Sequence, residues 1–519
     1  DRATRTLAFE RAAQMYRLAL ALDPTNQPRT IHIALGEVLA NAGRGAEAAD
    51  AFLSGMVGAP AGEALDLERR AARHLLLAGH IDRGLALLAS VLRQIGMRMP
   101  ATPAGALWSL TWRRSWMAIR RLGHRERAEA ELPASRLLEI DVAADVGNGL
   151  GLTAPIRAAD FHARYLRMAL AAGEPRRVAR ALAGEAAFVA IAGVKVMARA
   201  DALIARAQAL AERSGDPSTR AFVLGTAGTV AFQTGRWQQS ADAFQQAEQI
   251  IRDRCTGHRW ELATCQIFTL FSHTVRGSVR EVTQRLPALL EEANACGDLF
   301  SATTLQVSVA FWLPIMRGEP ELGYRAIEDA LARWSTGGGF HLQHANALNA
   351  LIHIDLYRGD SARAAESIRT HWSALRRSLI LRAQISRAML LTTRARVLVT
   401  EAARTGDHTG LAEATRLARS LERERADHVA GQGLGVRACV AMVRGDRELA
   451  MQLFADAEKT LDRAELNLHA ASMRYTRGRL LGGDEGAAVV ARAEAIISAQ
   501  GLPDPERVVR IYAPVMPER

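Results

Sequence analysis

A turn glycine returns at nearly even intervals through the second half of this sequence, and that spacing constrains the fold more than any other feature. After Gly235 the next six such glycines follow at 42, 41, 41, 47, 39 and 37 residues. In the copy that begins at Gly445, the small Ala450 and the large Phe454 come next. Glycine can reverse the chain in the left-handed conformation at a helix end. A small residue then lets two helices approach, and a large one fills the remaining space. The pattern therefore predicts helix pairs that stack as a repeat array.

The first residues of the chain carry a related pattern and resemble the tetratricopeptide repeat, a two-helix unit of about 34 residues. Ala12, Tyr16, Ala19 and Pro24 have the spacing of that repeat's second helix. The first helix of this unit would precede Asp1, so we expect the sequence to be part of a longer protein. The predicted fold is all-α: a tetratricopeptide-like superhelical solenoid of antiparallel helix pairs.

The composition agrees with a chain of packed helices. Hydrophobic residues make up 49% of the 519 positions, but aromatic residues only 5%, whereas strands favour aromatic and β-branched side chains. A chain of this length exceeds the size at which one core keeps growing, which favours several units or a solenoid. The four cysteines lack metal or redox spacing, and no apolar run is long enough to cross a membrane. We therefore predict a cytoplasmic chain without a membrane span.

The repeat period fails between Gly79 and Gly173, and this gap suggests a division of the chain. Residues 147–151 form a glycine-rich run with no preceding strand and no lysine. We interpret this run as a connecting loop and not as a phosphate-binding one. The predicted regions are N-terminal tetratricopeptide-like repeats over 1–100, with the first repeat truncated, an irregular Trp- and Arg-rich helical insertion with the Gly-rich loop over 101–155, the main helical-repeat solenoid over 156–500, and a C-terminal cap over 501–519.

Trp108, Trp112 and Trp116 recur every fourth residue in the insertion, so they lie along one side of a helix. Arginines flank them, and a basic helix with interfacial tryptophans can lie on an anionic membrane. It can equally dock on neighbouring helices with its arginines solvated on the far face. Acidic residues between positions 129 and 145 can neutralise those arginines, and we therefore favour docking.

The net charge of +11 is concentrated in two blocks. Residues 151–200 hold eight basic and three acidic residues, and residues 351–400 hold nine and three, which accounts for the whole excess. On the concave surface of a solenoid such residues would attract an acidic peptide, a phosphorylated segment or nucleic acid. Nucleic acid is the least favoured, because few aromatic residues interleave the arginines for base stacking. A solvated face in an arginine-biased chain stays open as the alternative.

A histidine pair precedes the second block. His341 and His344 are three residues apart, a spacing that can place two metal ligands on one helix face. No acidic or cysteine residue stands near them in sequence to complete a site, so we expect them to pack or to form hydrogen bonds. No nucleophile and base can be paired with confidence either, and we predict no catalytic residue, no cofactor and no metal. The candidate partner-binding residues are Arg157, Arg164, Arg167, Arg369, Arg376, Arg377, Arg387, His341 and His344.

Several segments point beyond the repeat pattern to one family. Two of them are LLLAGHIDRG at residues 75–84 and FHLQH at residues 340–344. Across nearly its whole length the chain resembles the C-terminal helical region of large bacterial serine/threonine kinase–ATPase proteins. Those proteins combine an N-terminal protein kinase, a central predicted ATPase of the signal-transduction type and a long tetratricopeptide-like tail. The other matching segments are Pro155-Ile156-Arg157, Asp160-Phe161, AGEPRRVARA at 172–181, Trp334-Ser335 and DLYRGD at 355–360.

The resemblance implies a non-catalytic sensor or protein-interaction tail. The sequence contains no glycine-rich kinase loop, no HRD-type catalytic loop, no DFG motif and no GxxxxGKS or GxxxxGKT phosphate loop. The implied partners are a protein or peptide, acidic if the arginine blocks contact it, and upstream kinase and ATPase domains in the same protein. Two alternatives remain: a free-standing scaffold or adaptor, and a solenoid that binds an acidic peptide or nucleic acid through the arginine blocks.

Overall fold

The computed structural model describes residues 2–22, 28–100, 105, 108–113, 122–151, 155–334 and 339–517. Helices form all the regular structure of these residues, and none of the described residues belongs to a strand. The predicted all-α class is therefore confirmed. None of the described helices is both long and apolar enough to cross a bilayer.

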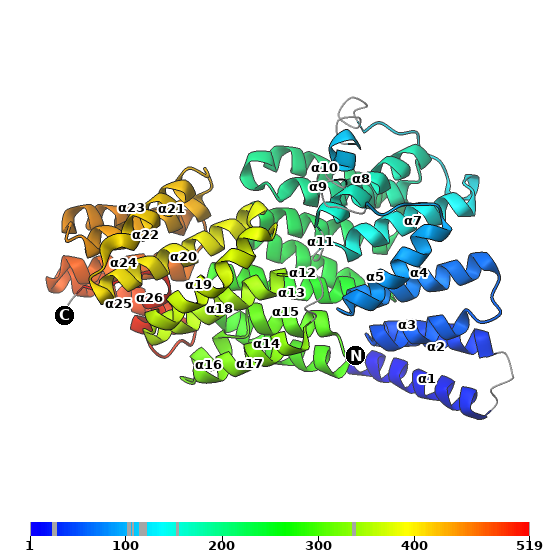
Figure 1. Ribbon diagram of the computed structural model, residues 1–519, viewed down its shortest axis with the longest axis horizontal. Helices are drawn as coiled ribbons and strands as arrows, with labels where there is room; N and C mark the ends of the chain where they lie inside the picture. Colours follow the sequence, from blue (N-terminus) through cyan, green and yellow to red (C-terminus); the bar gives the residue numbers. More distant parts are fainter. Residues whose placement is uncertain are drawn as a thin grey trace.

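The helices follow one another with short connections, and most neighbours along the chain pack side by side in antiparallel pairs (Figure 1). The first half contains α1 (Arg2–Leu22), α2 (Pro28–Asn41), α3 (Gly45–Gly55), α4 (Ala61–Leu77), α5 (Ile81–Gln94), α7 (Ala134–Gly149), α8 (Pro155–Ala172), α9 (Pro175–Ala190), α10 (Met197–Ser214), α11 (Pro217–Gln233) and α12 (Trp237–Arg254). The second half contains α13 (Arg259–Arg276), α14 (Val279–Ala295), α15 (Leu299–Ser308), α16 (Trp312–Met316), α17 (Glu321–Arg333), α18 (Leu342–Arg358), α19 (Ser361–Arg377), α20 (Gln384–Thr405), α21 (Leu411–Glu422), α22 (Asp427–Val443), α23 (Arg447–Arg463), α24 (Asn467–Leu481), α25 (Gly483–Ala499) and α26 (Pro505–Tyr512). Short 3-10 helices lie between them: η1 (Glu129–Glu131), η2 (Gly193–Val196), η3 (Ile380–Arg382) and η4 (His408–Gly410).

Alternate helices form an inner and an outer layer of the array. The inner helices α9, α11 and α13 touch one another in series, as do α18, α20 and α22, while α24 touches α26. Helix α18 lies between its partner α19 and the short α26, and it is buried on nearly all sides. The outer helix α19 buries one narrow face. This difference explains why an inner helix such as α22 buries small and apolar residues on several of its sides, whereas an outer helix such as α19 is amphipathic.

The predicted turn glycines end helices as expected. They have positive backbone φ angles between 71° and 90°, in the left-handed region that glycine enters without a steric penalty. At the end of α18, for example, the Gly359 N–H donates to the carbonyls of Asp355 and Leu356. The repeat spacing predicted from the sequence is thereby confirmed. The glycines concerned are Gly43, Gly79, Gly173, Gly235, Gly277, Gly318, Gly359, Gly406, Gly445 and Gly482.

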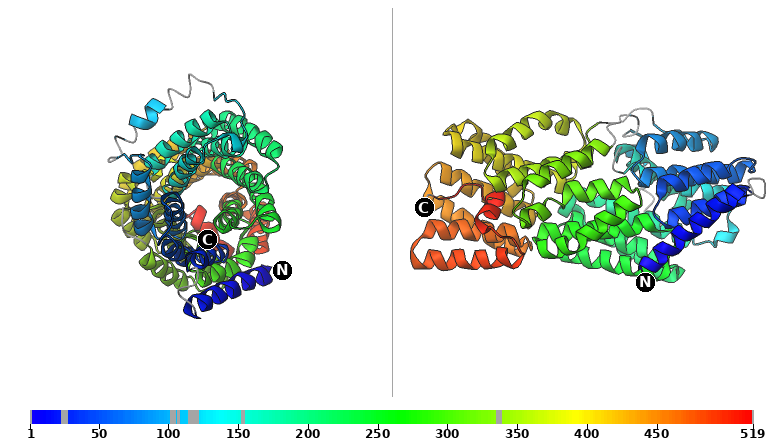
Figure 2. Two further views of the ribbon diagram at one scale, coloured as in Figure 1. Left: turned by 90° about the vertical axis from the view of Figure 1, so that its right-hand side faces the viewer. Right: turned by 90° about the horizontal axis from the view of Figure 1, so that it is seen from below.

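The array winds around one long axis, so that its helices form a ring when viewed along that axis (Figure 2, left). Successive turns of this superhelix touch at several points, for example through residue pairs that lie 188, 190, 220 and 254 positions apart in sequence. Arg73 on α4 donates to Glu261 Oε1 on α13 at 3.1 Å. The Val194 N–H donates to Gln384 Oε1 at 3.2 Å. The superhelical fold class is confirmed, and its turns stack directly on one another.

Two of the turn glycines also lie on the seam between successive turns. A Cβ on Gly235 would lie 2.3 Å from Nδ1 of His428, and a Cβ on Gly277 would lie 2.6 Å from Cγ of Leu468. Atoms without a bond between them do not approach so closely, so a side chain at either position would push the two turns apart. Glycine therefore has two roles at these positions, because it lets the chain reverse and also lets successive turns of the superhelix pack closely.

The Gly-rich end of the predicted insertion differs from the expectation. Gly147 and Gly149 do not form a loop but belong to α7, which ends at Gly149. A Cβ on Gly149 would lie 2.7 Å from Cδ1 of Leu76 on α4, and one on Gly147 would lie 3.5 Å from the backbone nitrogen of His162 on α8. The glycines let α7 pack closely on two helices, which outweighs their low helix propensity. The four regional boundaries stay predictions.

The described part of the tryptophan-bearing stretch, residues 108–113, turns its tryptophans to the solvent and an arginine to the protein, the reverse of the prediction. Trp108 and Trp112 are 75% and 62% exposed, and Trp116 lies outside the described residues. Arg113 turns inward, with Nε 3.3 Å from Oδ1 of Asp160 on α8. The expected arrangement with solvated arginines is therefore wrong for Arg113. The reason is that a carboxylate as deeply buried as Asp160 needs a cationic partner.

The seam between turns gives a first prediction. Gly277→Ala and Gly445→Ala both place a side chain at a positive φ, of 83° and 79°, which costs about 1–2 kcal/mol. At Gly445 the new Cβ meets nothing within 4 Å, whereas at Gly277 it meets Leu468 of the next turn. We therefore expect Gly277→Ala to lower the unfolding free energy by about 1–3 kcal/mol more than Gly445→Ala. Urea unfolding measures both, and equal losses would show that the turns do not stack at this position.

Candidate functional site

Four inner helices of the C-terminal half direct one side chain each toward the same neighbour. These are His353 on α18, Arg396 on α20, Cys439 on α22 and His469 on α24, and we call them together the inner face. The first three are separated by 43 residues each. They therefore occupy equivalent positions in successive repeats, as expected for a surface built by repetition.

The neighbour is the end of the chain, residues 505–517, which we call the C-terminal segment. It begins with α26, whose first turn is fixed by Pro505 and by the Asp504 carboxylate, which accepts a hydrogen bond from the Arg507 N–H at 3.1 Å. Val508, Val509 and Ile511 of this helix are fully buried. Helix α26 contacts both α18 and α24, and in the view along the superhelix axis the C-terminus falls inside the ring (Figure 2, left).

Tyr512 is the residue of the C-terminal segment that reaches most of the inner face. Its ring centroid lies 4.0 Å from that of His469 and 6.1 Å from that of His353. The guanidinium carbon of Arg396 lies 5.3 Å from the same ring centroid. Three residues further on, the backbone of Val515 forms a hydrogen bond with the Cys439 thiol. The C-terminal segment therefore touches all four members of the inner face.

Burial makes most of this cluster electrically neutral. It lowers the pKa of His353 to about 4 and holds the pKa of His469 well below its usual value, so neither imidazole is protonated at neutral pH. It also raises the pKa of Tyr512 above its usual range and that of the Cys439 thiol to about 12. These four groups carry no charge near pH 7.

Arg396 is the exception, because it keeps its charge inside this neutral surrounding. Burial lowers the pKa of its guanidinium to about 10, which still leaves it protonated near pH 7. The residue is only 4% exposed, and its Nε has no hydrogen-bond partner. The ionisable groups that act on it are Tyr512 and Cys439, neither of which is an acid at this pH. A buried charge without a counter-ion is costly, although a facing aromatic ring offsets part of the cost.

A second buried polar cluster lies on another side of α18. The Tyr324 hydroxyl donates to Oδ1 of Asp355 at 2.5 Å, and Arg363 Nε lies 3.6 Å from the same oxygen. Oδ2 of Asp355 is buried without a partner. Burial raises the pKa of Asp355 to about 6, against the opposing effects of the Tyr324 hydrogen bond and of Arg363. This cluster ties α17, α18 and α19 together, and it gives the protein a carboxyl group that titrates near pH 6.

The first group of predicted arginines lies on one helix, α8. Arg164 Nη2 pairs with Oδ2 of Asp160 at 2.8 Å, and its Nη1 donates to the carbonyl of Arg98 at 2.9 Å. Arg157 lies on the first turn of the helix. Arg167 is exposed and forms no ion pair within the described part of the chain. Arg164 thus serves the fold, and a partner-binding role for the three residues stays a prediction.

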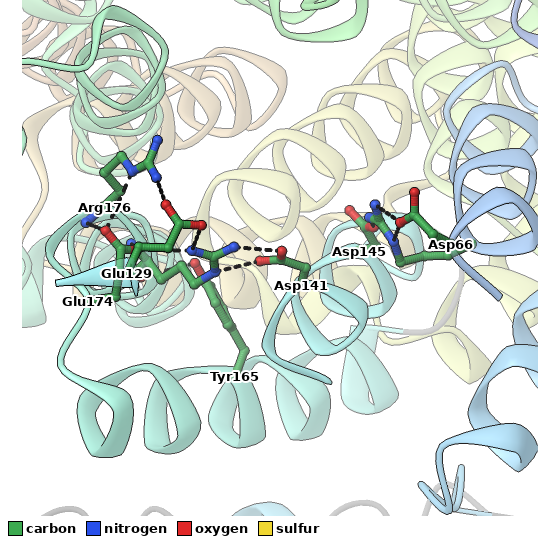
Figure 3. Close-up of polar contacts among 9 residues, drawn as sticks. Asp66, Glu129, Asp141, Asp145, Tyr165, Glu174 and Arg176 are labelled. Carbon is green, nitrogen blue, oxygen red and sulfur yellow. Dashed lines mark hydrogen bonds and ion pairs between the residues drawn. The ribbon is translucent and has the colours of Figure 1, made fainter. Parts of the chain in front are cut away.

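Figure 3 shows where other positive charges of this block go. Arg177 Nη2 lies 2.8 Å from Oδ2 of Asp141, and its Nη1 lies 3.2 Å from Glu129 Oε1 and 3.2 Å from Glu174 Oε2. Arg176 pairs with the same Glu129. Acidic residues that were expected to neutralise the tryptophan-bearing stretch therefore neutralise α9 instead. Part of the excess charge counted within residues 151–200 is therefore compensated by Glu129 and Asp141, which lie outside that range.

The second group of predicted arginines lies on and after the outer helix α19. Arg369 pairs with Glu366 at 2.6 Å, and Arg387 pairs with Glu424 at 2.6 Å. Arg376 and Arg377 are exposed and form no ion pair with any other described residue. Helix α18 lies between α19 and the C-terminal segment, so Arg369, Arg376 and Arg377 lie away from that segment, whereas Arg387 belongs to α20. A partner-binding role for these four residues stays a prediction.

The predicted histidine pair forms the N-terminal cap of α18. The Trp334 Nε1–H donates to Nδ1 of His341 at 3.1 Å, and the His341 backbone N–H donates to Nδ1 of His344 at 3.0 Å. The prediction that these residues form hydrogen bonds is confirmed. Burial lowers the pKa of both imidazoles, and the nearby His341 further lowers the pKa of His344. Within the described residues, no group of three or more His, Cys, Asp or Glu side chains is arranged to hold a metal ion.

Sequence reasoning missed the inner face. Arg396, Cys439, His469 and Tyr512 were not among the candidate residues, although the spacing of 43 residues from His353 to Arg396 and on to Cys439 could have flagged three equivalent positions. The apolar run Val-Val-Arg-Ile-Tyr of α26 was a further signal that the end of the chain packs against something. Neither signal says which face of a helix turns inward.

The fold and the inner face define a superhelical solenoid of antiparallel helix pairs. No protein-family model matches this chain, and no curated protein matches it. Among solved structures, the chain is similar to the pentatricopeptide repeat protein PPR10 from maize, with 12% identity and a TM-score of 0.22 over 92% of this chain and 66% of that one, slightly under two thirds. It is also similar to a circular tandem repeat protein of novel repeat topology, with 14% identity and a TM-score of 0.14 over 97% of this chain and 90% of that one. At such values nothing about a ligand or an activity transfers to this chain.

The Asp355 cluster predicts a pH dependence of stability. The folded protein holds the Asp355 proton more tightly than the unfolded chain, whose pKa is about 3.9. The resulting stabilisation is therefore full below about pH 4 and is lost as the pH rises through about 6. Asp355→Asn cannot ionise, so we expect its unfolding free energy relative to wild type to increase by up to about 3 kcal/mol between pH 4 and pH 7.

Chemical unfolding at each pH measures this difference. Glu366→Gln is the matched control, because Glu366 is an exposed carboxylate on the adjacent α19. The control should follow the wild-type profile. Parallel profiles for wild type and Asp355→Asn would contradict the assignment of a titrating group to this cluster.

Proposed function

We propose that this chain is a non-catalytic protein-interaction solenoid whose inner face binds a segment of a partner protein. The observation that carries the proposal is the C-terminal segment itself, a short amphipathic helix seated across α18 and α24 with Tyr512 on His353, Arg396 and His469. Binding a helix by its apolar face is a common mode of peptide recognition. The inner face already holds a helix of this kind in the same chain.

We further propose that the solenoid is the sensor tail of a bacterial serine/threonine kinase–ATPase and works in the cytoplasm. The segments LLLAGHIDRG at 75–84 and FHLQH at 340–344 support this proposal by their resemblance to that family. In such a protein, a ligand of the inner face could shift upstream domains only by its differential affinity for their two states. The reading frame before Asp1 tests the proposal. Kinase motifs and a phosphate loop are expected there, and a start codon within one helix length would contradict it.

An acidic peptide on the outer arginines is a second candidate. Arg376 and Arg377 favour it, because they are adjacent, exposed and without an ion-pair partner in the described part of the chain. Such binding would be electrostatic and would weaken with salt. A peptide that binds equally well at high and low salt does not use this surface.

The inner-face proposal predicts that removal of the Tyr512 side chain makes the inner face available to an added peptide. The probe is a fluorescent peptide with the sequence of residues 503–517. In the wild-type chain the C-terminal segment competes for the site from within the same molecule. In Tyr512→Ala the segment loses its aromatic contacts, and we expect the peptide to bind at least about tenfold more tightly, because loss of a buried aromatic ring costs about 3–5 kcal/mol. Fluorescence anisotropy measures the two affinities.

Leu449→Ala provides the matched control. Leu449 is an exposed apolar side chain on the outer helix α23, so its loss should leave the affinity at the wild-type value. If wild type, Tyr512→Ala and Leu449→Ala bind the peptide equally, or if none of them binds it, the inner face is not a peptide site.

A further inference from the structure

The unpaired charge of Arg396 points to the chemistry of the partner. The helices around it contribute His353 from α18, Cys439 from α22 and His469 from α24, and the C-terminal segment contributes Tyr512. None of these groups is an acid. The guanidinium therefore has the Tyr512 ring and other neutral groups near it, and its Nε is left without an acceptor.

A folded protein rarely retains such an arrangement for stability alone. Removal of a guanidinium from water costs several kcal/mol unless a counter-ion or a full set of acceptors replaces the solvent. Even half-buried arginines of this chain have such partners: Arg69 on α4 pairs with Asp66 and Asp145, and Arg177 on α9 pairs with three carboxylates. Arg396 differs from both of these in lacking a carboxylate.

The position of Arg396 is also special, because the group that covers it belongs to the short helix α26, which lies across α18 and α24. The Tyr512 ring lies over the guanidinium, and residues 513–517 follow without another helix. Helix α26 packs on α18, α24 and α25 and is followed by residues without regular structure, so it can leave its site without unravelling the helix pairs, because each repeat contacts mainly its neighbours. Departure of the segment would expose Arg396 between His353 and His469.

We infer that the inner face recognises an acidic side chain, Asp or Glu, of the partner segment through an ion pair with Arg396, and that the C-terminal segment covers this residue until the partner displaces it. The inference rests on the proposed peptide-binding function and names the chemistry of its ligand. The partner's carboxylate takes the place of the Tyr512 ring, where it can accept two parallel N–H bonds from the guanidinium. The apolar side chains around the acid then occupy the positions of Val508, Val509 and Ile511.

The experiment compares two peptides that differ only in charge. Both have the sequence of residues 503–517, with Glu in place of Tyr512 in one and Gln in the other. They are titrated into the full chain carrying Tyr512→Ala, and into the same chain carrying Arg396→Met as well. We expect the Glu peptide to bind at least about tenfold more tightly than the Gln peptide, the size of a hydrogen bond to a charged group. In Arg396→Met this preference should disappear, while the Gln peptide keeps its affinity within about twofold.

Arg416→Met is the matched control. It removes an exposed arginine from the outer helix α21 and should leave the preference for Glu intact. Arg396→Met should unfold at the same temperature as its parent or higher, because it replaces an unpaired buried charge by an apolar chain of similar length. If Arg396→Met does not fold, Arg396→Gln takes its place in the titration with the same expected loss of preference.

The outcomes separate the inference from the proposed function. Equal affinity for the two peptides, or a preference for Glu that survives in Arg396→Met, overturns the acidic-ligand inference while leaving peptide binding in place. Absence of binding by either peptide overturns both. A preference for Glu that depends on Arg396 but not on Arg416 supports the inference.

Discussion

The close approach of one superhelical turn to the next is the constraint on which the rest of the structure depends. At Gly235 and Gly277 a loop meets the following turn where no side chain fits. Beside the first contact, the Trp237 ring packs edge-on against His428 with centroids 5.2 Å apart. Because these residues hold successive turns together, the angle between neighbouring repeats cannot open without breaking contacts between sequence-distant residues. The array is therefore held as a superhelix whose turns stack on one another, and its inner and outer faces have very different surroundings.

This difference between the inner and outer faces decides where selectivity for a partner can arise. Outer helices carry exposed ion pairs such as Arg369–Glu366, and pairs of this kind contribute little to stability or recognition because water and salt screen them. On the inner face the helices α18, α20, α22 and α24 surround one guanidinium with neutral groups. Because little water surrounds this charge, its Coulomb interaction with an opposite charge is screened less than at the surface. The single buried Arg396 therefore matters more for choosing a partner than the denser arginines outside.

The helix pairs were predictable because their signal is local. A turn glycine such as Gly445 and the residues that follow it report on one chain reversal, and the structure repeats that reversal along the array. The equal spacing of His353, Arg396 and Cys439 is visible in the sequence. Their meeting with Tyr512 was not predictable, because it depends on the curvature of several repeats. Counting charge along the sequence misled for the same reason. Arg177 finds its carboxylates on segments outside its own block, so the count within that block did not measure exposed charge.

The residue that the C-terminal segment places on Arg396 explains how the inner face can be covered and yet remain able to bind a partner. An acid at position 512 would pair with Arg396 and hold the C-terminal segment in place through a strong, desolvated ion pair. Tyr512 instead fills the volume and faces the guanidinium with its ring, an interaction worth about 0.5–2 kcal/mol. The segment covers the inner face, but it leaves Nε of Arg396 without a hydrogen-bond acceptor. Its advantage over a partner is the high effective concentration of a tethered segment, on the order of millimolar. A partner with a well-placed carboxylate gains the ion pair that the segment lacks, and this difference sets which sequences can displace it.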